Sequence, residues 1–590
     1  MKKISVTFTA ACLIFFLADV DSSSDQVKGK AFIPQDLNVD WSAPRPNVLI
    51  FLVDDMGYSD LGSYGSTNAS TPNIDSLIDS GMKFRQWVSA APICTPSRAS
   101  LQTGRYPIRT GCIGNVEKYR VLPTPSNPHG LDPAKHVSIA TALKEGGYRT
   151  GMSGKWHLGI NGNKEFQEQD RAFTPSAHSY ESYVGAPYTN APMCAVDGDG
   201  ISRKYRAGQT FCFLMKNDTV VEQPLRLENF TSTITTHAVD FIRSQNKDDP
   251  WFFLMSYFHV HTPLFSQRKN RGRSRGGRFG DNVEELDDSV GEIMKELRRQ
   301  GFENNTLIFF TSDNGPYQEE GWENSGRTNI YDDVTGERVG RLRGGKGQVF
   351  EGGIRMPGAV VWPGFVAEGS QSDTMVSTMD IFPTALAAAG VSLGKEYVVD
   401  GKDMGPVIRG ETNKTQHDVM LHYCGFNILA ARVDGRFKLF WKIQKWYTND
   451  PRNSSICLEC CNGINPASLL VAPATQLCGC AQKDLISLQT PVVYDMLLDP
   501  FESKPLTEDT WPQDADLTLQ DVIRLAQSKK ERMEKEVHPK PDSQGAGTCT
   551  SGLPAAARQP CCAGCKQLVP FFGFCRYAGG LGKKCDCVDE

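Results

Sequence analysis

The sequence lacks a long apolar segment, a strong excess of charge of either sign and any low-complexity tract. Beyond its first residues no uninterrupted apolar run reaches about 18 residues, which a membrane-spanning helix needs, so we expect no transmembrane segment. The net charge of the 590 residues is −5 and charged residues make up 22%, which argues against a nucleic-acid-binding protein and against a disordered chain. No internal repeat is present. The length predicts two or three domains.

The N-terminus has the features of a signal peptide. A basic start, Met1-Lys2-Lys3, precedes an apolar run that ends at Leu17 and is too short to cross a bilayer comfortably. We expect residues 1–21 to be cleaved, residues 22–45 to form an extension, and the protein to be secreted, with the lysosome as the alternative destination. Six Asn-x-Ser/Thr sites agree with secretion and can carry glycans if exposed: Asn68, Asn217, Asn229, Asn304, Asn413 and Asn453.

The cysteines also fit an oxidising compartment. Of the 18 cysteines, Cys12 leaves with the signal peptide, and setting Cys94 aside leaves an even number, which is compatible with complete pairing. The connectivity cannot be deduced from the sequence. Seven cysteines lie between Cys549 and Cys587, where histidine is absent. A disulfide-rich tail over residues 546–590 is therefore favoured over a zinc site.

Two apolar runs end in acidic and amide side chains. Residues 47–53 and 306–312 are typical of strands buried on both faces of a parallel sheet. Side chains at the carboxyl ends of such strands enter the crevice where α/β proteins bind ligands. A lone Asp-Asp at a strand end is more often a turn or a cap, so the matched second strand is what favours a metal site. The four side chains are hard oxygen donors that suit Ca²⁺ or Mg²⁺: Asp54, Asp55, Asp313 and Asn314.

Helical periodicity alternates with these strands. Apolar residues recur at helical spacing within residues 132–146, 233–245 and 282–300, and another apolar strand begins at Trp251 and leads into polar residues. This alternation predicts an α/β fold with a largely parallel sheet. A polar amphipathic helix is expected over residues 518–537, before the linker to the tail.

Cys94 stands in a different context from the other cysteines. It directly precedes Thr95-Pro96-Ser97-Arg98, and because Pro and Ser open helices, we expect Cys94 at a helix N-terminus. Together with Leu101-Gln102-Thr103-Gly104-Arg105, this stretch resembles the signature of the sulfatase family, whose cysteine is oxidised after synthesis to formylglycine, the catalytic aldehyde. A half-cystine is the usual role of a cysteine in a secreted chain, so the hypothesis depends on the other active-site residues.

Further family patterns follow in the expected order. Gly154-Lys155-Trp156-His157-Leu158-Gly159 resembles the second sulfatase signature, whose lysine and histidine contact the sulfate. From an extended stretch, Lys155 and His157 would point the same way. The family's active-site histidine, which precedes x-Pro, matches His261, and its second lysine, which precedes Glu-Gly-Gly-x-Arg-x-Pro, matches Lys346. Without these matches, a solvated lysine and a satisfied polar histidine are the simpler interpretations.

The resemblance covers about residues 46–510 and implies an alkaline-phosphatase-like α/β fold, with a mixed, largely parallel sheet flanked by helices. We expect a catalytic domain over residues 46–415, a smaller C-terminal α+β domain over 416–545 and the Cys-rich tail. The resemblance also implies one divalent cation per chain, calcium rather than magnesium. Its implied ligands are Asp54, Asp55, Cys94 (as formylglycine), Asp313 and Asn314.

The reaction expected from this resemblance is hydrolysis of a sulfate ester. Its negative charge repels nucleophiles, and charge moves to the bridging oxygen as the S–O bond breaks, so catalysis needs cations at the non-bridging oxygens and a proton for the leaving group. The cations would be calcium, Arg98, Lys155 and Lys346. The proton would come from His261 or His157, and the family favours His261. A formylglycine hydrate would attack sulfur with one hydroxyl, and its second hydroxyl would later expel sulfate as the aldehyde reforms.

The substrate is less constrained than the reaction. The chain looks closest to the family's arylsulfatase A and steryl sulfatase branch, but residues 186–212 are short and polar where steryl sulfatase has a hydrophobic membrane hairpin, which argues against a membrane anchor and a sterol substrate. Aryl sulfates are the expected test substrates, and sulfated glycans or glycolipids the natural ones. The basic loop, residues 268–278, holds six basic residues; it is either merely solvated or steers a sulfated polysaccharide of the matrix towards the site.

Two alternatives stay open at this point. A phosphomonoesterase of the same fold would use a Ser or Thr nucleophile and transition metals, which Cys94 and a single oxygen-rich site disfavour. A structural or sulfated-glycan-binding component of the extracellular matrix is the other alternative, which the complete set of active-site residues disfavours. The implied partners are the sulfate-ester substrate and the formylglycine-generating enzyme that modifies Cys94 during maturation. The oligomeric state is not predicted.

Overall fold

The computed structural model describes residues 45–116, 130–160, 173–190, 212–223, 225–318, 325–332, 335–394, 396–445 and 479–538, together with two short paired strands, β18 (Cys565–Gln567) and β19 (Cys575–Tyr577). The predicted signal peptide, Asn453 and most of the Cys-rich tail lie outside these residues. Among the helices described, none is long and apolar enough to cross a membrane.

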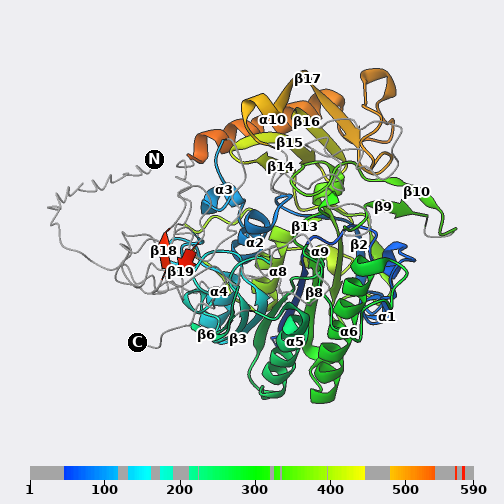
Figure 1. Cartoon of the computed structure of the whole chain (residues 1–590). Coiled ribbons are helices and arrows are strands. Elements are labelled where there is room, and N and C mark those ends of the chain that lie inside the picture. The colour runs from blue at the N-terminus through cyan, green and yellow to red at the C-terminus, as the bar shows by residue number, and fades with distance from the viewer. Residues whose placement is uncertain are drawn as a thin grey trace, which may run out of the picture.

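An eleven-stranded mixed sheet forms the larger part of the molecule (Figure 1). Five neighbouring parallel strands form its centre, in the order β8 (Thr306–Ser312), β1 (Asn47–Val53), β7 (Trp251–Ser256), β3 (Arg149–Lys155) and β4 (Ser182–Ala186). Beyond β8 lie β11 (Arg355–Val361), β2 (Met82–Val88), β12 (Ser370–Ser372) and β13 (Val376–Ser377). Beyond β4 lie two antiparallel strands, β5 (Leu214–Lys216) and β6 (Thr219–Glu222). The predicted largely parallel α/β sheet is confirmed.

The central strands are the apolar runs expected from the sequence. Every residue of β1 is buried, because β7 and β8 flank it on both edges and helices cover the sheet. The register pairs Leu52 with Ser256 and Val53 with Ser312. The three strands therefore end at the same edge of the sheet, and the residues that follow them are brought together there.

Two groups of helices pack against the sheet. The first group contains α1 (Pro72–Asp79), α5 (Leu227–Arg243) and α6 (Gly277–Gln300), and the second contains α2 (Cys94–Thr103), α4 (Ile139–Glu145) and α8 (Ile381–Ala388) (Figure 1). Three boundaries differ from expectation. The helix within 132–146 covers only α4, because Ser138 caps it by accepting a hydrogen bond from Thr141 N. Helices α5 and α6 begin earlier than expected; in α5 the buried Leu227 and Phe230 extend the apolar stripe.

A smaller antiparallel sheet follows in the chain. It contains β14 (Val419–Cys424), β15 (Asn427–Val433), β16 (Phe437–Gln444) and β17 (Leu485–Asp495), and α10 (Leu519–Glu536) packs against it (Figure 1). Helix α10 is the helix predicted over 518–537, and Thr518 and Asp521 form its capping box. The disulfide Cys424–Cys480 joins the end of β14 to the segment that leads into β17. The smaller C-terminal α+β unit is thus present, while the boundary at residues 415 and 416 stays a prediction.

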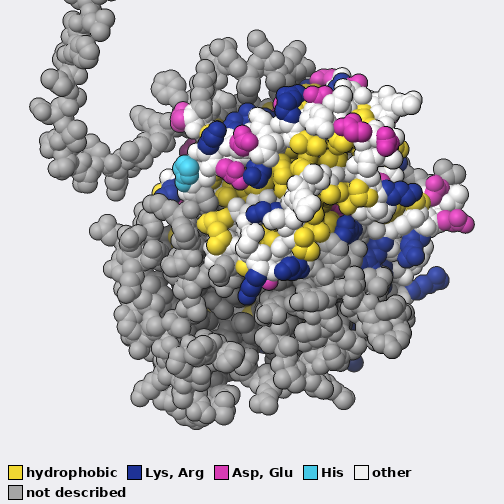
Figure 2. Space-filling model, turned by 90° about the horizontal axis from the view of Figure 1, so that it is seen from above, with side chains coloured by type: hydrophobic (Ala, Val, Ile, Leu, Met, Phe, Trp, Pro, Cys, Tyr) yellow, Lys and Arg dark blue, Asp and Glu magenta, His cyan; other side chains and the backbone are white. Residues whose placement is uncertain are grey.

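Short elements complete the described chain: α3 (Pro107–Thr110), α7 (Glu351–Ile354), α9 (Gly405–Ile408), β9 (Asn329–Tyr331) and β10 (Arg338–Arg341). Figure 2 views the molecule from above and shows hydrophobic side chains gathered between charged ones on that side. In the C-terminal part of the chain, Ile486, Leu497 and Leu498 are exposed large hydrophobic residues.

A buried network of charged side chains joins the two parts. Glu351 on α7 accepts hydrogen bonds from Arg355 Nε at 2.7 Å, from Arg432 Nη1 on β15 at 2.8 Å and from Lys438 Nζ on β16 at 2.9 Å. Lys438 Nζ also lies 2.7 Å from Glu502 Oε1. All five side chains are buried, and a buried cation without a carboxylate partner is strongly destabilising. The network therefore holds the C-terminal sheet against α7.

Candidate active site

Main-chain hydrogen bonds continue past the ends of the central strands. Asp54 N donates to His259 O at 2.8 Å, Val260 N donates to Asp54 O at 2.6 Å, and Asp313 N donates to Val53 O at 3.0 Å. The segments that follow β1, β7 and β8 are therefore hydrogen-bonded to one another at this edge of the sheet. Asp55 has a positive φ of 56°, an uncommon conformation for a residue other than glycine, and such residues cluster at functional sites.

Cys94 is the first residue of α2, as predicted, and its side chain lies inside this group. Its Sγ lies 3.5 Å from Asp54 Oδ1 and 4.0 Å from Asp55 Oδ1. The residue is 1% exposed and forms no disulfide. Burial raises the pKa of the thiol above its ordinary value, because the charged thiolate is poorly solvated there. An unmodified thiol at this position is therefore neutral and a poor nucleophile.

Three basic side chains balance three carboxylates around Cys94. Each basic group has a carboxylate partner: Lys155 Nζ lies 2.5 Å from Asp54 Oδ2, Lys346 Nζ lies 2.6 Å from Asp55 Oδ2, and Arg98 Nη2 lies 2.8 Å from Asp313 Oδ2. All six residues are buried. The structure thus brings the predicted metal-binding and sulfate-binding residues into one cluster, drawn from five elements of the large sheet and its connections.

The charged side chains of the cluster shift one another's pKa values. Burial opposes ionisation of Asp54, but Lys155 and the other nearby cations outweigh it and hold its pKa far below the usual range. Burial and the charge of Asp54 raise the pKa of Asp313 to about 7. Burial opposes the charge of Lys346, yet Asp55 and its neighbours raise the pKa of this lysine above its ordinary value. This lysine is thus held in the charged form.

The two candidate proton donors have different surroundings. His261 Nε2 lies 3.7 Å from Asp55 Oδ2, Nδ1 contacts Thr262 O, and the side chain is 15% exposed. Burial and Lys346 lower the pKa of His261 to about 4. His157 is fully buried, and neither ring nitrogen has a hydrogen-bond partner within the described part of the chain. Burial and Lys155 lower the pKa of His157 well below its ordinary value.

The expected extended geometry at His157 is wrong. Strand β3 ends at Lys155, and His157 has a φ of 59°, in the left-handed region. The alternation of side chains along a strand therefore does not apply to this pair. Thr95 Oγ1 instead fixes the segment by donating to His157 O at 3.1 Å, and both polar residues act electrostatically on the same cluster.

The donor set fits a hard divalent cation. Ligand atoms of Asp54, Asp55, Cys94 and His261 all lie within 4.8 Å of one another. Asn314 Nδ2 donates to Asp55 Oδ1 at 2.7 Å, while its buried Oδ1 has no partner among the described residues. Carboxylate and amide oxygens are the ligands that calcium prefers. Asp313 lies outside the tightest group because Arg98 holds its Oδ2.

Glycines allow the turn that carries Lys346 to approach α7 closely. A Cβ on Gly352 would lie 2.2 Å from Gly344 O, and one on Gly353 would lie 2.0 Å from Gln348 O. Neither distance is possible for a real side chain, so the Gly-Gly pair after Glu351 is a packing requirement. The sequence pattern around Lys346 therefore has a direct structural cause.

Two further residues support the cluster and carry no motif of their own. Ser256 Oγ at the end of β7 accepts from Arg98 Nη1 at 2.6 Å and donates to Lys155 O at 2.6 Å. Gln444 Nε2 at the end of β16 donates to Gly347 O at 2.8 Å, directly after Lys346. Ser256 could have been found by the strand-end argument that found Asp54. No local signal marks Gln444, because it belongs to the other sheet.

The candidate glycosylation sites among the described residues do not belong to this buried cluster. Asn217, Asn229, Asn304 and Asn413 are exposed and Asn68 is half-buried. Four of the six sites are therefore accessible to a glycan in the folded chain.

Comparisons with known proteins decide the family. The sequence profile of the sulfatases matches residues 46–391, and that of the C-terminal region of aryl-sulfatase matches residues 415–574. The chain belongs to the sulfatase family. It is a sulfuric ester hydrolase, and the predicted resemblance and enzyme class are confirmed.

Relatives of this sulfatase span most of its length. Steryl-sulfatase of Rattus norvegicus is 32% identical, covering 80% of this chain and 87% of the relative. An arylsulfatase of Hemicentrotus pulcherrimus is 34% identical, covering 81% of this chain and 80% of the relative. The crystal structure of the sulfatase PsFucS1 from Pseudoalteromonas sp. superposes with a TM-score of 0.65 at 25% identity, covering 84% of this chain and 92% of that one. The alkaline-phosphatase-like sulfatase fold is thereby confirmed.

Proposed function

We propose that this sulfatase is a secreted arylsulfatase that acts through a formylglycine made from Cys94 and one bound calcium ion. The convergence of Asp54, Asp55, Cys94 and His261 ligand atoms within 4.8 Å carries the proposal. A buried group of this kind, with balanced charges, suits a dication and a small anion. When present, the calcium ion and the formylglycine hydrate supply positive charge and an oxygen nucleophile.

The acidic residues hold the metal in this proposal. Asp54 and Asp55 offer carboxylate oxygens, and Asn314 offers the amide oxygen that otherwise lacks a partner among the described residues. Asp313, paired with Arg98, completes the set. Lys155 and Lys346 already neutralise Asp54 and Asp55, so a cation that took over these carboxylates would leave both ammonium groups for the substrate.

The basic residues hold the sulfate ester. Lys155, Lys346 and Arg98 stabilise the charge on the non-bridging oxygens, because preorganised cations in a dry site act strongly on developing charge. His261 serves as the proton donor to the leaving oxygen in its imidazolium form, because Thr262 O holds the Nδ1 proton and only the charged ring carries a second proton on Nε2. A bound sulfate anion favours this charged form. His157 is a further sulfate contact in this proposal. Magnesium is the less suitable metal.

The leaving group is less specified than the sulfate pocket. The ring centroid of Tyr317 lies 5.8 Å from Lys346 Nζ, and Tyr317 is half-buried. An aromatic or sugar ring can pack against such a side chain. This supports aryl sulfates as test substrates and sulfated glycans or glycolipids as natural ones. Secretion, and glycans on the exposed sites, follow from the signal peptide; the lysosome is the alternative destination.

Mass spectrometry of the tryptic peptide that contains residue 94, together with metal analysis and an assay on 4-nitrophenyl sulfate, tests the proposal. We expect an aldehyde in place of the thiol, one calcium ion per chain and repeated turnover. The formylglycine-generating enzyme is needed in the expression host. Cys94→Ser should turn over poorly, because a serine cannot expel sulfate by reforming an aldehyde.

The same experiment separates the alternatives. An unmodified Cys94 with no turnover in a competent host would contradict the enzyme mechanism and favour a glycan-binding matrix component. Hydrolysis of 4-nitrophenyl phosphate in preference to the sulfate would favour a phosphomonoesterase. Wild-type turnover by Cys94→Ser would rule out the formylglycine.

A further inference from the structure

The basic loop, residues 268–278, begins beside the candidate active site. Glu285 Oε2 on α6 accepts a hydrogen bond from Gln267 N at 2.8 Å and lies 3.6 Å from His259 Nε2. One carboxylate oxygen therefore joins the start of the loop to the residue two positions before His261. The loop is placed at the same edge of the sheet as the catalytic cluster.

The loop has a fixed backbone. Asp281 on α6 accepts hydrogen bonds from Gly272 N at 2.7 Å and from Ser274 N at 2.9 Å. Two arginines are tied to neighbouring helices by ion pairs: Arg271 to Glu228 at 3.1 Å and Arg273 to Asp288 at 2.9 Å. These contacts determine where the rest of the loop projects.

The other four basic side chains of the loop are uncompensated. They are exposed, and no ion pair or hydrogen bond joins their side chains to other residues in the described ranges: Arg268, Lys269, Arg275 and Arg278. A fixed array of like charges next to a site raises the local concentration of an oppositely charged ligand. The array is therefore suited to an anion with several charges.

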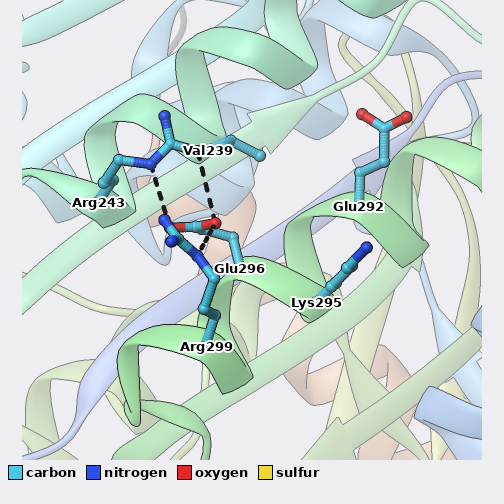
Figure 3. A pocket seen from close by; sticks show the side chains of 6 residues that line it. All are labelled: Val239, Arg243, Glu292, Lys295, Glu296 and Arg299. Atoms are coloured by element: carbon cyan, nitrogen blue, oxygen red, sulfur yellow. Dashed lines mark hydrogen bonds and ion pairs between the residues drawn. The ribbon is translucent and has the colours of Figure 1, made fainter.

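The opposite end of α6 has basic residues in a different arrangement. Arg243 and Arg299 line a hollow of about 590 Å³ between α5 and α6 with Glu296, which pairs with both arginines (Figure 3). Asp240 also pairs with Arg243, at 2.8 Å, so two carboxylates neutralise the charge of the two arginines. The paired arginines of the hollow therefore do not offer a polyanion the free charge that the basic loop offers.

We propose that the basic loop is a binding subsite for a sulfated polysaccharide whose ester is hydrolysed at the neighbouring site. The inference rests on the proposed function, because it takes the cluster around Cys94 as the place of reaction. A polymer can place its other sulfates on several loop cations at once, whereas a small aryl sulfate has no second anion to reach them. The loop therefore contributes to binding of the polymer and not to the chemical step.

Two full-length variants with equal loss of charge test the subsite. The first replaces the four free loop cations, Arg268→Gln, Lys269→Gln, Arg275→Gln and Arg278→Gln. The matched control replaces four exposed cations on α10 and around the far end of α5 and α6: Lys247→Gln, Lys295→Gln, Arg532→Gln and Lys535→Gln. The probe is dextran sulfate as an inhibitor of 4-nitrophenyl sulfate hydrolysis, with direct binding measured by calorimetry.

We expect the loop variant to raise the inhibition constant of dextran sulfate about tenfold at about 50 mM salt, and to lose this difference at about 500 mM salt. Its kcat and KM for 4-nitrophenyl sulfate should equal those of the wild type, and the control variant should behave as the wild type. Equal inhibition constants in all three proteins, or equal shifts in both variants, would overturn the inference.

Two further outcomes are informative. One would show that the loop binds a membrane surface, and the other would show that the proposed enzyme activity is absent. Loop-dependent binding to phosphatidylserine vesicles without an effect on dextran sulfate would assign the loop to a membrane surface and overturn the inference. If the wild type does not hydrolyse 4-nitrophenyl sulfate, the proposed function fails. Calorimetry then decides the loop separately, because loop-dependent binding of dextran sulfate supports the subsite and loop-independent binding refutes it.

Discussion

Arg98 links several parts of the candidate active site. Its Nε donates to Asp313 Oδ2 at 2.9 Å, its Nη2 forms an ion pair with the same oxygen at 2.8 Å, and its Nη1 donates to Ser256 Oγ at 2.6 Å. The residue is buried, so these contacts stand in place of hydration by bulk water. A planar guanidinium can make all of them at once, whereas an ammonium group cannot.

We therefore expect Arg98→Lys to lower the free energy of unfolding by about 1–3 kcal/mol and to reduce kcat/KM at least about tenfold, because buried polar groups lose partners. Urea denaturation and an aryl sulfate assay measure the two effects. The control is Arg85→Lys, whose partner Asp373 lies at the surface. A loss no larger than that of the control would contradict the prediction.

Asn314 provides a test of the metal site that does not depend on activity. Its Oδ1 is buried and unpartnered in the described chain, and the proposal gives this oxygen to calcium. We expect Asn314→Ala to raise the calcium concentration needed for a given thermal stabilisation about tenfold, because a ligand at free concentration L that binds only the folded state stabilises it by RT ln(1 + L/Kd). Differential scanning fluorimetry with a calcium titration measures this.

The control for this titration is Asn329→Ala. Asn329 is also buried with an unpartnered Oδ1 among the described residues, but it lies on β9 outside the cluster. An unchanged calcium dependence in Asn314→Ala would remove Asn314 from the metal site. Chelation of calcium should also abolish turnover by the wild type.

At the scale of elements, the C-terminal sheet contacts the turn beside the candidate active site through β16. Gln444 Nε2 donates to Gly347 O, and Gly347 N donates to Pro92 O at 2.7 Å. The turn that carries Lys346 is therefore held between the second sheet and the segment before Cys94. The disulfide at Cys424 stabilises the same corner, because Gln444 Nε2 also lies 3.3 Å from Cys424 Sγ.

We expect Gln444→Leu to raise KM for aryl sulfates about threefold to tenfold while kcat changes less, because an unsatisfied carbonyl at Gly347 displaces Lys346, the proposed sulfate-binding lysine. Steady-state kinetics separates the two constants. Lys442→Leu on the same strand is the control, since its side chain is only half-buried and has no hydrogen bond in the described chain. Equal KM values for both variants would show that β16 does not position Lys346.

The local parts of the site could be predicted from the sequence, and the contacts between distant segments could not. Asp54 and Asp313 follow long buried strands, and period and polarity are enough to place such strand ends. Helix α4 is shorter than its apolar pattern because a capping serine intervenes. His157 leaves the extended conformation where Thr95, from a distant segment, binds its carbonyl oxygen, and Gln444 acts across the boundary between sheets. No local sequence signal marks either contact.

At the scale of the whole molecule, the two sheets are joined by charge rather than by apolar surface alone. Glu502 takes part in this interface and is 2% exposed. Burial and the nearby charge of Glu351 raise the pKa of Glu502 to about 7, although Lys438 opposes the shift. Between its ordinary value of 4.5 and about 7, the folded chain therefore holds a proton that the unfolded chain has lost.

Because the folded state binds more protons in this window, the contribution of Glu502 to stability is present at low pH and is lost as the pH rises through about 7. We expect the free energy of unfolding of the wild type to fall between pH 5 and pH 8 relative to Glu502→Gln, by about 1–3 kcal/mol. Urea denaturation at both pH values measures this. Glu531→Gln on the exposed face of α10 is the control and should show the wild-type slope. A wild-type slope in Glu502→Gln would contradict the assignment.

The burial of Cys94 has a consequence for the time course of biosynthesis. If Cys94 is converted as proposed, the modifying enzyme needs access to the surrounding stretch, yet the folded chain leaves 1% of the residue accessible. Under this proposal, modification has to precede folding. A chain that folded before modification would be stable and correctly shaped, but it would lack the proposed nucleophile.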